Sequence, residues 1–148
     1  MSDLRDLYQE VIFDHYKTPH NCHALAGADH VAHGHNRLCG DKITVYLQLE
    51  GDVIKDLSFE GAGCAIATAS ASMMTDALKG KKLADVEHLF QQFHHMVTHD
   101  DAQTDPALGK LEVLAGVREF PVRVKCATLA WHTMQAALKD RNVPVSTE

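Results

Sequence analysis

The sequence predicts an α+β fold in which a small three-stranded antiparallel sheet is covered by helices on one side. Apolar and polar side chains alternate over residues 42–59, as they do in half-buried strands. Segments on either side instead repeat their apolar residues every three or four positions, as amphipathic helices do. A length of 148 residues with 45% hydrophobic content is enough for a real core, so we expect residues 1–148 to form one domain.

An amphipathic helix is expected over residues 3–17. Ser2 or Asp3 can cap its start, and Pro19 ends it because the residue before a proline avoids the helical region. We expect its apolar face to pack on the core; a partner-binding or self-association face is the alternative. That face consists of Leu4, Leu7, Tyr8, Val11, Ile12 and His15.

The strands are expected in the next third of the chain. Residues 20–35 are polar and rich in histidine, which is typical of a loop or an edge strand. The hairpin of residues 42–59 turns at Glu50-Gly51-Asp52 and buries one face. A third strand is expected within residues 29–38, because a lone hairpin is only marginally stable.

Helices are expected over most of the remaining chain. Pro121 suits the first turn of the last helix, because its missing N–H is not needed there. Residues 97–110 are polar and predict a loop, and Pro144 with the polar tail is expected to end the fold. The helices are predicted over residues 64–78, 83–96, 106–115 and 121 to about 141.

Charge and composition exclude several classes of function. The net charge of −6 argues against nucleic acid as a partner, since phosphate binding needs a basic surface. No apolar run approaches the roughly 18 residues of a membrane helix, and the N-terminus has no signal pattern. We therefore expect a cytoplasmic protein whose four cysteines serve metal binding or thiol chemistry, not disulfides.

Cys39, Asp41, Cys64 and Cys126 are predicted to meet as one metal- or cluster-binding site. Cys39 and Asp41 are two positions apart around Gly40, so in an extended strand they point the same way. Cys64 follows a Gly-x-Gly turn and opens a helix, whose N-terminus favours a thiolate, and Cys126 lies in the second turn of the last helix. Three thiolates and a carboxylate suit tetrahedral Zn²⁺, and thiolates also suit iron–sulfur clusters.

The remaining candidate ligands are weaker. Cys22 lacks a glycine turn and a cysteine neighbour, so we interpret it as a bystander, with a redox-sensitive surface thiol as the alternative. His95 and His99 would be one helical turn apart, near His94, but two histidines without a third ligand are weak evidence for a metal. A solvated surface is the preferred interpretation of these histidines.

Three segments carry a family resemblance over nearly the whole chain. Asn36-Arg37-Leu38-Cys39-Gly40-Asp41 resembles the Asn-x-x-Cys-Gly-Asp signature of iron–sulfur cluster assembly scaffolds, the family of IscU and NifU N-terminal domains. Residues 61–75 are similar to the second cysteine motif of that family, and Tyr8 to Pro19 resembles its N-terminal helix and exit. The resemblance implies the small sheet with covering helices of that family.

Within this family the sequence resembles the SufU branch. Lys125 precedes the third cysteine where IscU has a histidine, and residues 97–117 look like the SufU insertion. Glu119-Phe120-Pro121-Val122-Arg123 stands in place of the Leu-Pro-Pro-Val-Lys motif that an Hsp70 chaperone recognises.

The resemblance implies a zinc-dependent sulfurtransferase that accepts persulfide sulfur from a SufS-like cysteine desulfurase. Cys39 is the expected acceptor, because a strand-end loop moves more easily than a helix-anchored cysteine. Arg123 and Lys125 either stabilise thiolate or persulfide charge or are solvated surface charges. Two alternatives stay open: a scaffold on which an iron–sulfur cluster is built through the three cysteines, and a purely structural zinc domain. Whether the protein is an enzyme is therefore also open.

Overall fold

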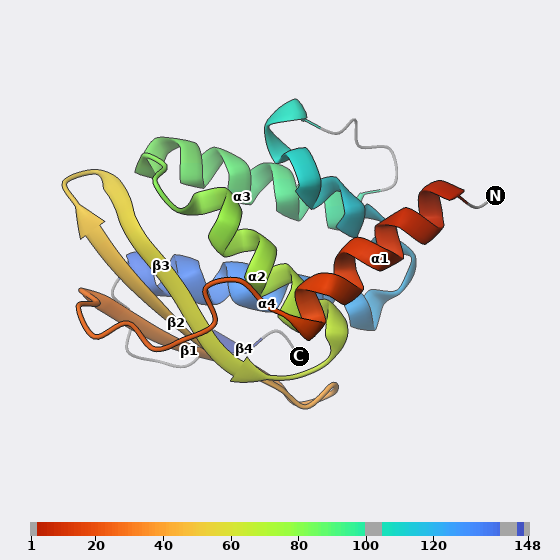
Figure 1. Cartoon of the computed structure of the whole chain (residues 1–148), viewed down its shortest axis with the longest axis horizontal. Coiled ribbons are helices and arrows are strands. Elements are labelled where there is room, and N and C mark those ends of the chain that lie inside the picture. Colours follow the sequence, from red (N-terminus) through yellow and green to blue (C-terminus); the bar gives the residue numbers. More distant parts are fainter. Residues whose placement is uncertain (1–2, 100–104, 140–144, 147–148) are drawn as a thin grey trace.

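A computed structural model describes residues 3–99, 105–139 and 145–146 (Figure 1). The elements follow the order helix, three strands, four helices and a short strand. They are α1 (Asp3–Lys17), β1 (His30–Asn36), β2 (Asp41–Glu50), β3 (Val53–Ala62), α2 (Ala65–Leu78), α3 (Leu83–Thr98), the 3₁₀ helix η1 (Pro106–Glu119), α4 (Pro121–Leu138) and β4 (Val145–Ser146).

The sheet has four strands in the order β3-β2-β1-β4 and is mixed. β1 and β3 pair antiparallel with β2, which confirms the hairpin and the predicted third strand. The prediction of three antiparallel strands is wrong, because β4 adds a parallel pair in which Gly34 lies opposite Val145. A two-residue strand is too short to show alternation, so the polar tail appeared to lie outside the fold.

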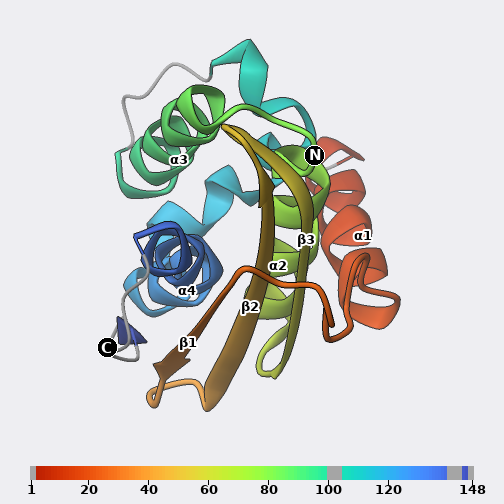
Figure 2. The same ribbon diagram turned by 90° about the vertical axis from the view of Figure 1, so that its left-hand side faces the viewer.

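Helices cover one face of the sheet, as predicted. α4 packs across β1 and β2, and α2 packs against β3 (Figure 2). α1 lies on the outer side of α2 and is separated by it from the strands (Figure 2). α2 and α4, which carry or adjoin two of the predicted site cysteines, are therefore the two helices that rest directly on the sheet.

The alternation of β2 decides which side chains enter the core. Ile43, Val45 and Leu47 are buried, whereas the side chains between them are half-buried. Farther from the sheet, the rings of Phe93 and Trp131 stack with their centroids 4.4 Å apart and tie α3 to α4. Both aromatic side chains are fully buried, so this contact contributes a large apolar area to the core.

Most helix predictions are confirmed, with shifted ends. α4 ends at Leu138, a few residues before the predicted end. The predicted short helix is a longer 3₁₀ helix, kinked at Gly109, whose φ of 53° requires a residue without a side chain. Residues 100–104 of the predicted loop lie outside the described part of the chain.

The N-terminal helix has the predicted bounds. Val11 and Ile12 on its apolar face are partly buried against the core, which confirms the packing expected of that face. The predicted caps at Ser2 and Asp3, and the apolar positions before residue 9, lie outside the described side chains. None of the helices that the structure describes is long and apolar enough to span a membrane.

Candidate metal centre

Cys39, Asp41 and Cys126 come together from three elements. Cys39 lies in the turn between β1 and β2, Asp41 is the first residue of β2, and Cys126 lies in the second turn of α4. One ligand atom from each of the three lies within 4.8 Å of the other two. The Sγ atoms of Cys39 and Cys126 are 3.0 Å apart. The structure therefore brings three of the four predicted residues together.

Cys64 lies beside this group and contacts it through Asp41. Its Sγ is 4.0 Å from Oδ2 of Asp41, and its backbone N–H donates a 2.8 Å hydrogen bond to Oδ1. The Cys64 sulfur also accepts a hydrogen bond from the backbone N–H of Ala67 and so caps α2. The sequence predicted Cys64 in the first turn of this helix. The structure instead places it at the N-cap, one residue before the helix begins.

Glycines shape the turn and the entry to α2 for two different reasons. Gly40 has a φ of 70°, which a glycine adopts without strain, while a Cβ placed there would meet no atom within 4 Å. A Cβ at Gly63 would lie only 2.5 Å from Oδ1 of Asp41. Cys39 and Asp41 therefore share one side because of a left-handed turn residue, and not because both lie in an extended strand.

Asn36 belongs to the cysteine motif, but the sequence alone predicts no role for it. It is fully buried, and its Nδ2 donates to the Sγ of Cys126 at 3.7 Å. Its Oδ1 accepts a hydrogen bond from the backbone N–H of Leu38, which fixes the start of the turn that carries Cys39. The available signal was an asparagine at the end of an expected strand, directly before the cysteine turn.

Burial and neighbouring thiols set the electrostatics of the group. Burial is the main cause that raises the pKa of Cys126 well above its ordinary value, and hydrogen bonds with Cys39, Asp41 and Cys64 add to the rise. The pKa of Arg123 is also raised, chiefly by the charge of a Cys64 thiolate. Arg123 is therefore close enough to the thiols to stabilise negative charge on them.

An exposed groove of about 630 Å³ opens above Cys39 and Cys64. Three apolar side chains on its rim are largely exposed: Leu38 at 64%, Phe120 at 59% and Val122 at 47%. Arg123 also lines this groove. Apolar side chains gathered around a reactive group are typical of a surface that another protein covers.

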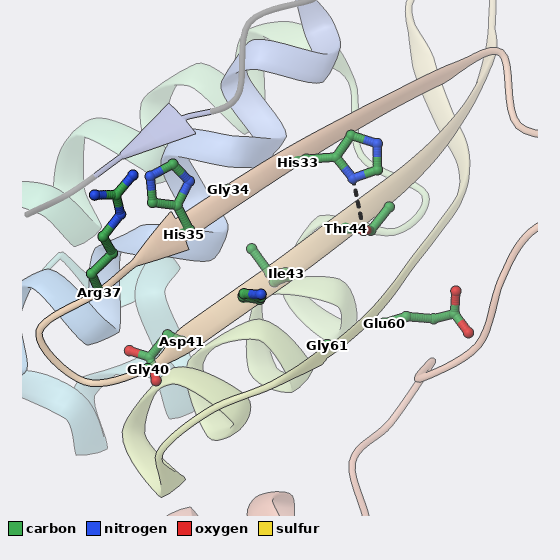
Figure 3. Close-up of a pocket in the computed structure, with 11 residues that line it drawn as sticks. His33, Gly34, His35, Arg37, Gly40, Asp41, Ile43, Thr44, Glu60 and Gly61 are labelled. Atoms are coloured by element: carbon green, nitrogen blue, oxygen red, sulfur yellow. Dashed lines mark hydrogen bonds between the residues drawn. The ribbon is translucent and has the colours of Figure 1, made fainter.

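A second hollow, of about 700 Å³, lies on the face of the sheet opposite the described helices (Figure 3). His33 and His35 project from β1 into this region, and Nδ1 of His33 lies 2.9 Å from Oγ1 of Thr44 (Figure 3). Asp41 lies at one end of the hollow, next to Gly40 (Figure 3). Asp41 itself is buried, with 1% of its surface exposed, so this hollow does not open onto the cysteine group.

The weaker candidates lie outside the cysteine group. All four cysteines are free thiols, and Cys22 is exposed. The rings of His95 and His99 stack at 4.1 Å, but no described residue joins them in a group of three metal-capable side chains. Both histidines are exposed, as the solvated-surface interpretation expects.

Comparison with known proteins decides the family. A model of the NifU-like N-terminal domain matches residues 7–143. The chain belongs to the NifU-like N-terminal domain family. All four predicted ligands of this NifU-like chain, from Cys39 to Cys126, lie within the matched residues.

Individual relatives of this NifU-like chain cover most of its length. It is 42% identical over 134 residues to the zinc-dependent sulfurtransferase SufU of Bacillus subtilis. This alignment covers 90% of each of the two chains. It is also 42% identical to the iron–sulfur cluster assembly scaffold protein IscU of Streptococcus pyogenes, across 94% of this chain and 87% of that protein. The crystal structure of FiSufU from Fervidobacterium islandicum AW-1 superposes with a TM-score of 0.82 at 33% identity, covering 90% of this chain and 98% of that one.

Proposed function

We propose that this protein is a zinc-dependent sulfurtransferase of iron–sulfur cluster assembly, which accepts persulfide sulfur from a cysteine desulfurase. The observation that carries the proposal is the convergence of Cys39, Asp41 and Cys126 at one point, with Cys64 in contact through Asp41. Residues 1–148 would form one assembly domain that acts in the cytoplasm.

The donor set fits zinc. Thiolate sulfur and carboxylate oxygen are both common zinc ligands, and four such groups complete a tetrahedral site. We assign Cys39, Asp41, Cys64 and Cys126 as the four ligands, of which Cys64 has to move the most to join the other three. Zinc, when bound, would keep the thiols deprotonated at neutral pH and would occupy their lone pairs.

Cys39 is the proposed acceptor of sulfur. Its thiolate attacks the outer sulfur of the desulfurase persulfide, so one S–S bond forms on Cys39 as the S–S bond of the desulfurase breaks. The desulfurase cysteine leaves as a thiolate, and no net oxidation occurs. Cys39 lies in a turn, whereas Cys64 and Cys126 are held at or within helices, so Cys39 can reach a partner without unwinding a helix.

The groove above Cys39 is the proposed docking surface for the desulfurase. Its exposed apolar rim supplies area that a partner can bury, and Arg123 supplies positive charge next to the reacting sulfurs. A docked partner would also exclude water from the transferred persulfide, which protects it from side reactions.

A second candidate function is that of a scaffold on which an iron–sulfur cluster is assembled and passed on. The same three thiols favour it, because thiolates are the usual ligands of such clusters. The 42% identity to the S. pyogenes scaffold protein favours it as well.

Metal analysis and mass spectrometry together test the proposal. Protein purified without air should be colourless with one zinc per chain; brown protein with acid-labile sulfide would support the scaffold instead. After incubation with a SufS-like desulfurase and cysteine, mass spectrometry should find a persulfide on Cys39. A persulfide on Cys64 alone, or on Cys22, would contradict Cys39 as the acceptor. Cys22→Ala is the matched control, because this thiol is exposed and lies outside the group.

A further inference from the structure

Two histidines and an aspartate form a second cluster around α1 and α2. His15 lies on α1, His20 lies in the segment after that helix, and Asp76 lies on α2. One ligand atom from each lies within 4.8 Å of the other two, and the two imidazole rings have their centroids 4.5 Å apart. None of the three is a member of the cysteine group.

Ser72 holds the ring of His15 and the backbone of His20 from the buried side. Its Oγ lies 2.7 Å from Nδ1 of His15 and accepts a 2.8 Å hydrogen bond from the backbone N–H of His20. A hydroxyl oxygen has two lone pairs, so it can also accept from a protonated Nδ1 of His15. That tautomer leaves the Nε2 lone pair of His15 for a metal, and a hydrogen bond that holds the other ring nitrogen is typical of metal-binding histidines.

Asp76 is held in place on the opposite side of the cluster. Its Oδ2 lies 2.5 Å from Nδ1 of His20, and its Oδ1 accepts a 3.4 Å hydrogen bond from Nδ2 of Asn21. Asn21 also donates to Oγ1 of Thr75, so the segment after α1 is fastened to α2 by side chains on both sides of His20. The cluster is therefore built by two elements that the fold already holds together.

We propose that His15, His20 and Asp76 form a second divalent-metal site, which takes a borderline cation such as Zn²⁺ or Fe²⁺. Imidazole nitrogen and carboxylate oxygen suit these ions, and three protein ligands leave positions open for water or a small anion. The side chains of His20 and Asp76 are 55% and 45% exposed, so an ion can enter from solvent.

The surroundings make this site weaker than the cysteine site. A cavity of about 270 Å³ is lined by His15 and Asp76 and also by Lys81 and Lys110, whose positive charges oppose a cation. The site also lacks thiolates, which bind zinc strongly. We therefore expect it to fill only after the cysteine site and to exchange its ion faster. A bound ion would hold the segment that follows α1 against α2.

Cobalt titration of the metal-stripped full chain tests this site. Co²⁺ bound by thiolates shows sulfur-to-metal charge-transfer absorption, whereas Co²⁺ bound by histidine and carboxylate does not. Two ions should bind, the first with that absorption and the second without it. His20→Gln and Asp76→Asn should each abolish the second ion and leave the first unchanged. Both replaced side chains are about half exposed, so the variants should fold.

The control is His88→Gln, which breaks the exposed pair of His88 and Asp105. The two side chains are 3.0 Å apart, and no third metal-capable side chain among the described residues joins them. This variant should keep both ions. Binding of a single ion by the unmodified chain, or a second ion that persists in both His20→Gln and Asp76→Asn, would overturn the proposal. In Cys39→Ala the charge-transfer absorption should weaken while the second ion remains, so this test is independent of the sulfurtransferase proposal.

Discussion

Oδ1 of Asp41 accepts a 2.8 Å hydrogen bond from the backbone N–H of Cys64. This bond joins the first residue of β2 to the N-terminus of α2, although 23 positions separate the two residues. The carboxylate occupies a place where a helix N-terminus stabilises negative charge. One oxygen of Asp41 thus has a structural role, and Oδ2 faces the thiol of Cys64.

Replacing Gly63 by alanine should disturb the site through this carboxylate. The new Cβ would lie 2.5 Å from Oδ1 of Asp41 and 3.2 Å from its Cα, so the strand end and its side chain must move. We expect weaker zinc binding and a loss of about 1–3 kcal/mol in the free energy of unfolding, as for other overpacked positions. Competition with a chromophoric chelator and urea unfolding measure the two effects.

Gly116→Ala is the control for that variant, because a Cβ there would meet no atom within 4 Å. It should leave zinc affinity unchanged. Equal zinc affinities for Gly63→Ala and Gly116→Ala would contradict the assignment of Asp41 as a ligand.

Removing the metal should destabilise the fold. The proposed ligands come from a turn, a strand and two helix starts, so the free energy of binding adds to that of folding. At a ligand concentration 1,000 times the dissociation constant the contribution is about 4 kcal/mol. We expect a chelator to lower the melting temperature by roughly 10 °C. An unchanged melting temperature would contradict a stabilising role of the metal.

The metal-free protein should lose stability in alkaline solution because of Cys126. Burial raises the pKa of this thiol above its ordinary value of 9.0, so the folded state keeps the proton that the unfolded state releases. The unfolded state therefore binds fewer protons above about pH 9, and the free energy of unfolding falls there by up to about 1.4 kcal/mol per pH unit. Urea unfolding of chelator-treated protein between about pH 8 and pH 10 measures this slope.

Cys126→Ala provides the comparison for the alkaline loss. It should be less stable at every pH, because it opens a cavity in the core, but its stability should decline less steeply above about pH 9. Identical slopes for the variant and the unmodified chain would contradict the assignment to Cys126.

Arg123→Gln should slow sulfur transfer while leaving the fold intact. Arg123 lines the groove with Cys39 and Cys64, and the raised pKa of its guanidinium reflects nearby thiolate charge. Because the side chain is exposed and its charge is screened, we expect a decrease of only about two- to fivefold in the rate of persulfide formation. Lys125→Gln is the comparison and should have a smaller effect. An equal or larger loss in Lys125→Gln would reverse this assignment.

Local sequence signals were sufficient for most of the secondary structure. The alternation from Ile43 to Leu49 and the helical repeat of residues 3–17 depend only on which face of an element is buried, and both elements were predicted correctly. Prolines and glycines gave approximate ends, such as the start of α4 at Pro121. β4 was missed because two residues carry no periodic pattern.

The sequence also indicated the proposed members of the cysteine site, because Cys39, Asp41, Cys64 and Cys126 each lie at a glycine turn or near a helix start. Only the tertiary structure decided the distances between them. It places the sulfurs of Cys39 and Cys126 in direct contact and leaves Cys64 outside the group of three.

The same limit applies to residues whose roles depend on packing between distant elements. Asn36 lies against Cys126, 90 positions away, and His20 reaches Asp76 across 56 positions. No local pattern encodes such contacts, because they depend on how α1, α2 and α4 pack against each other and against the sheet. Side-chain periodicity specifies the face that an element buries, whereas the distance between two side chains on different elements is fixed only when those faces have packed.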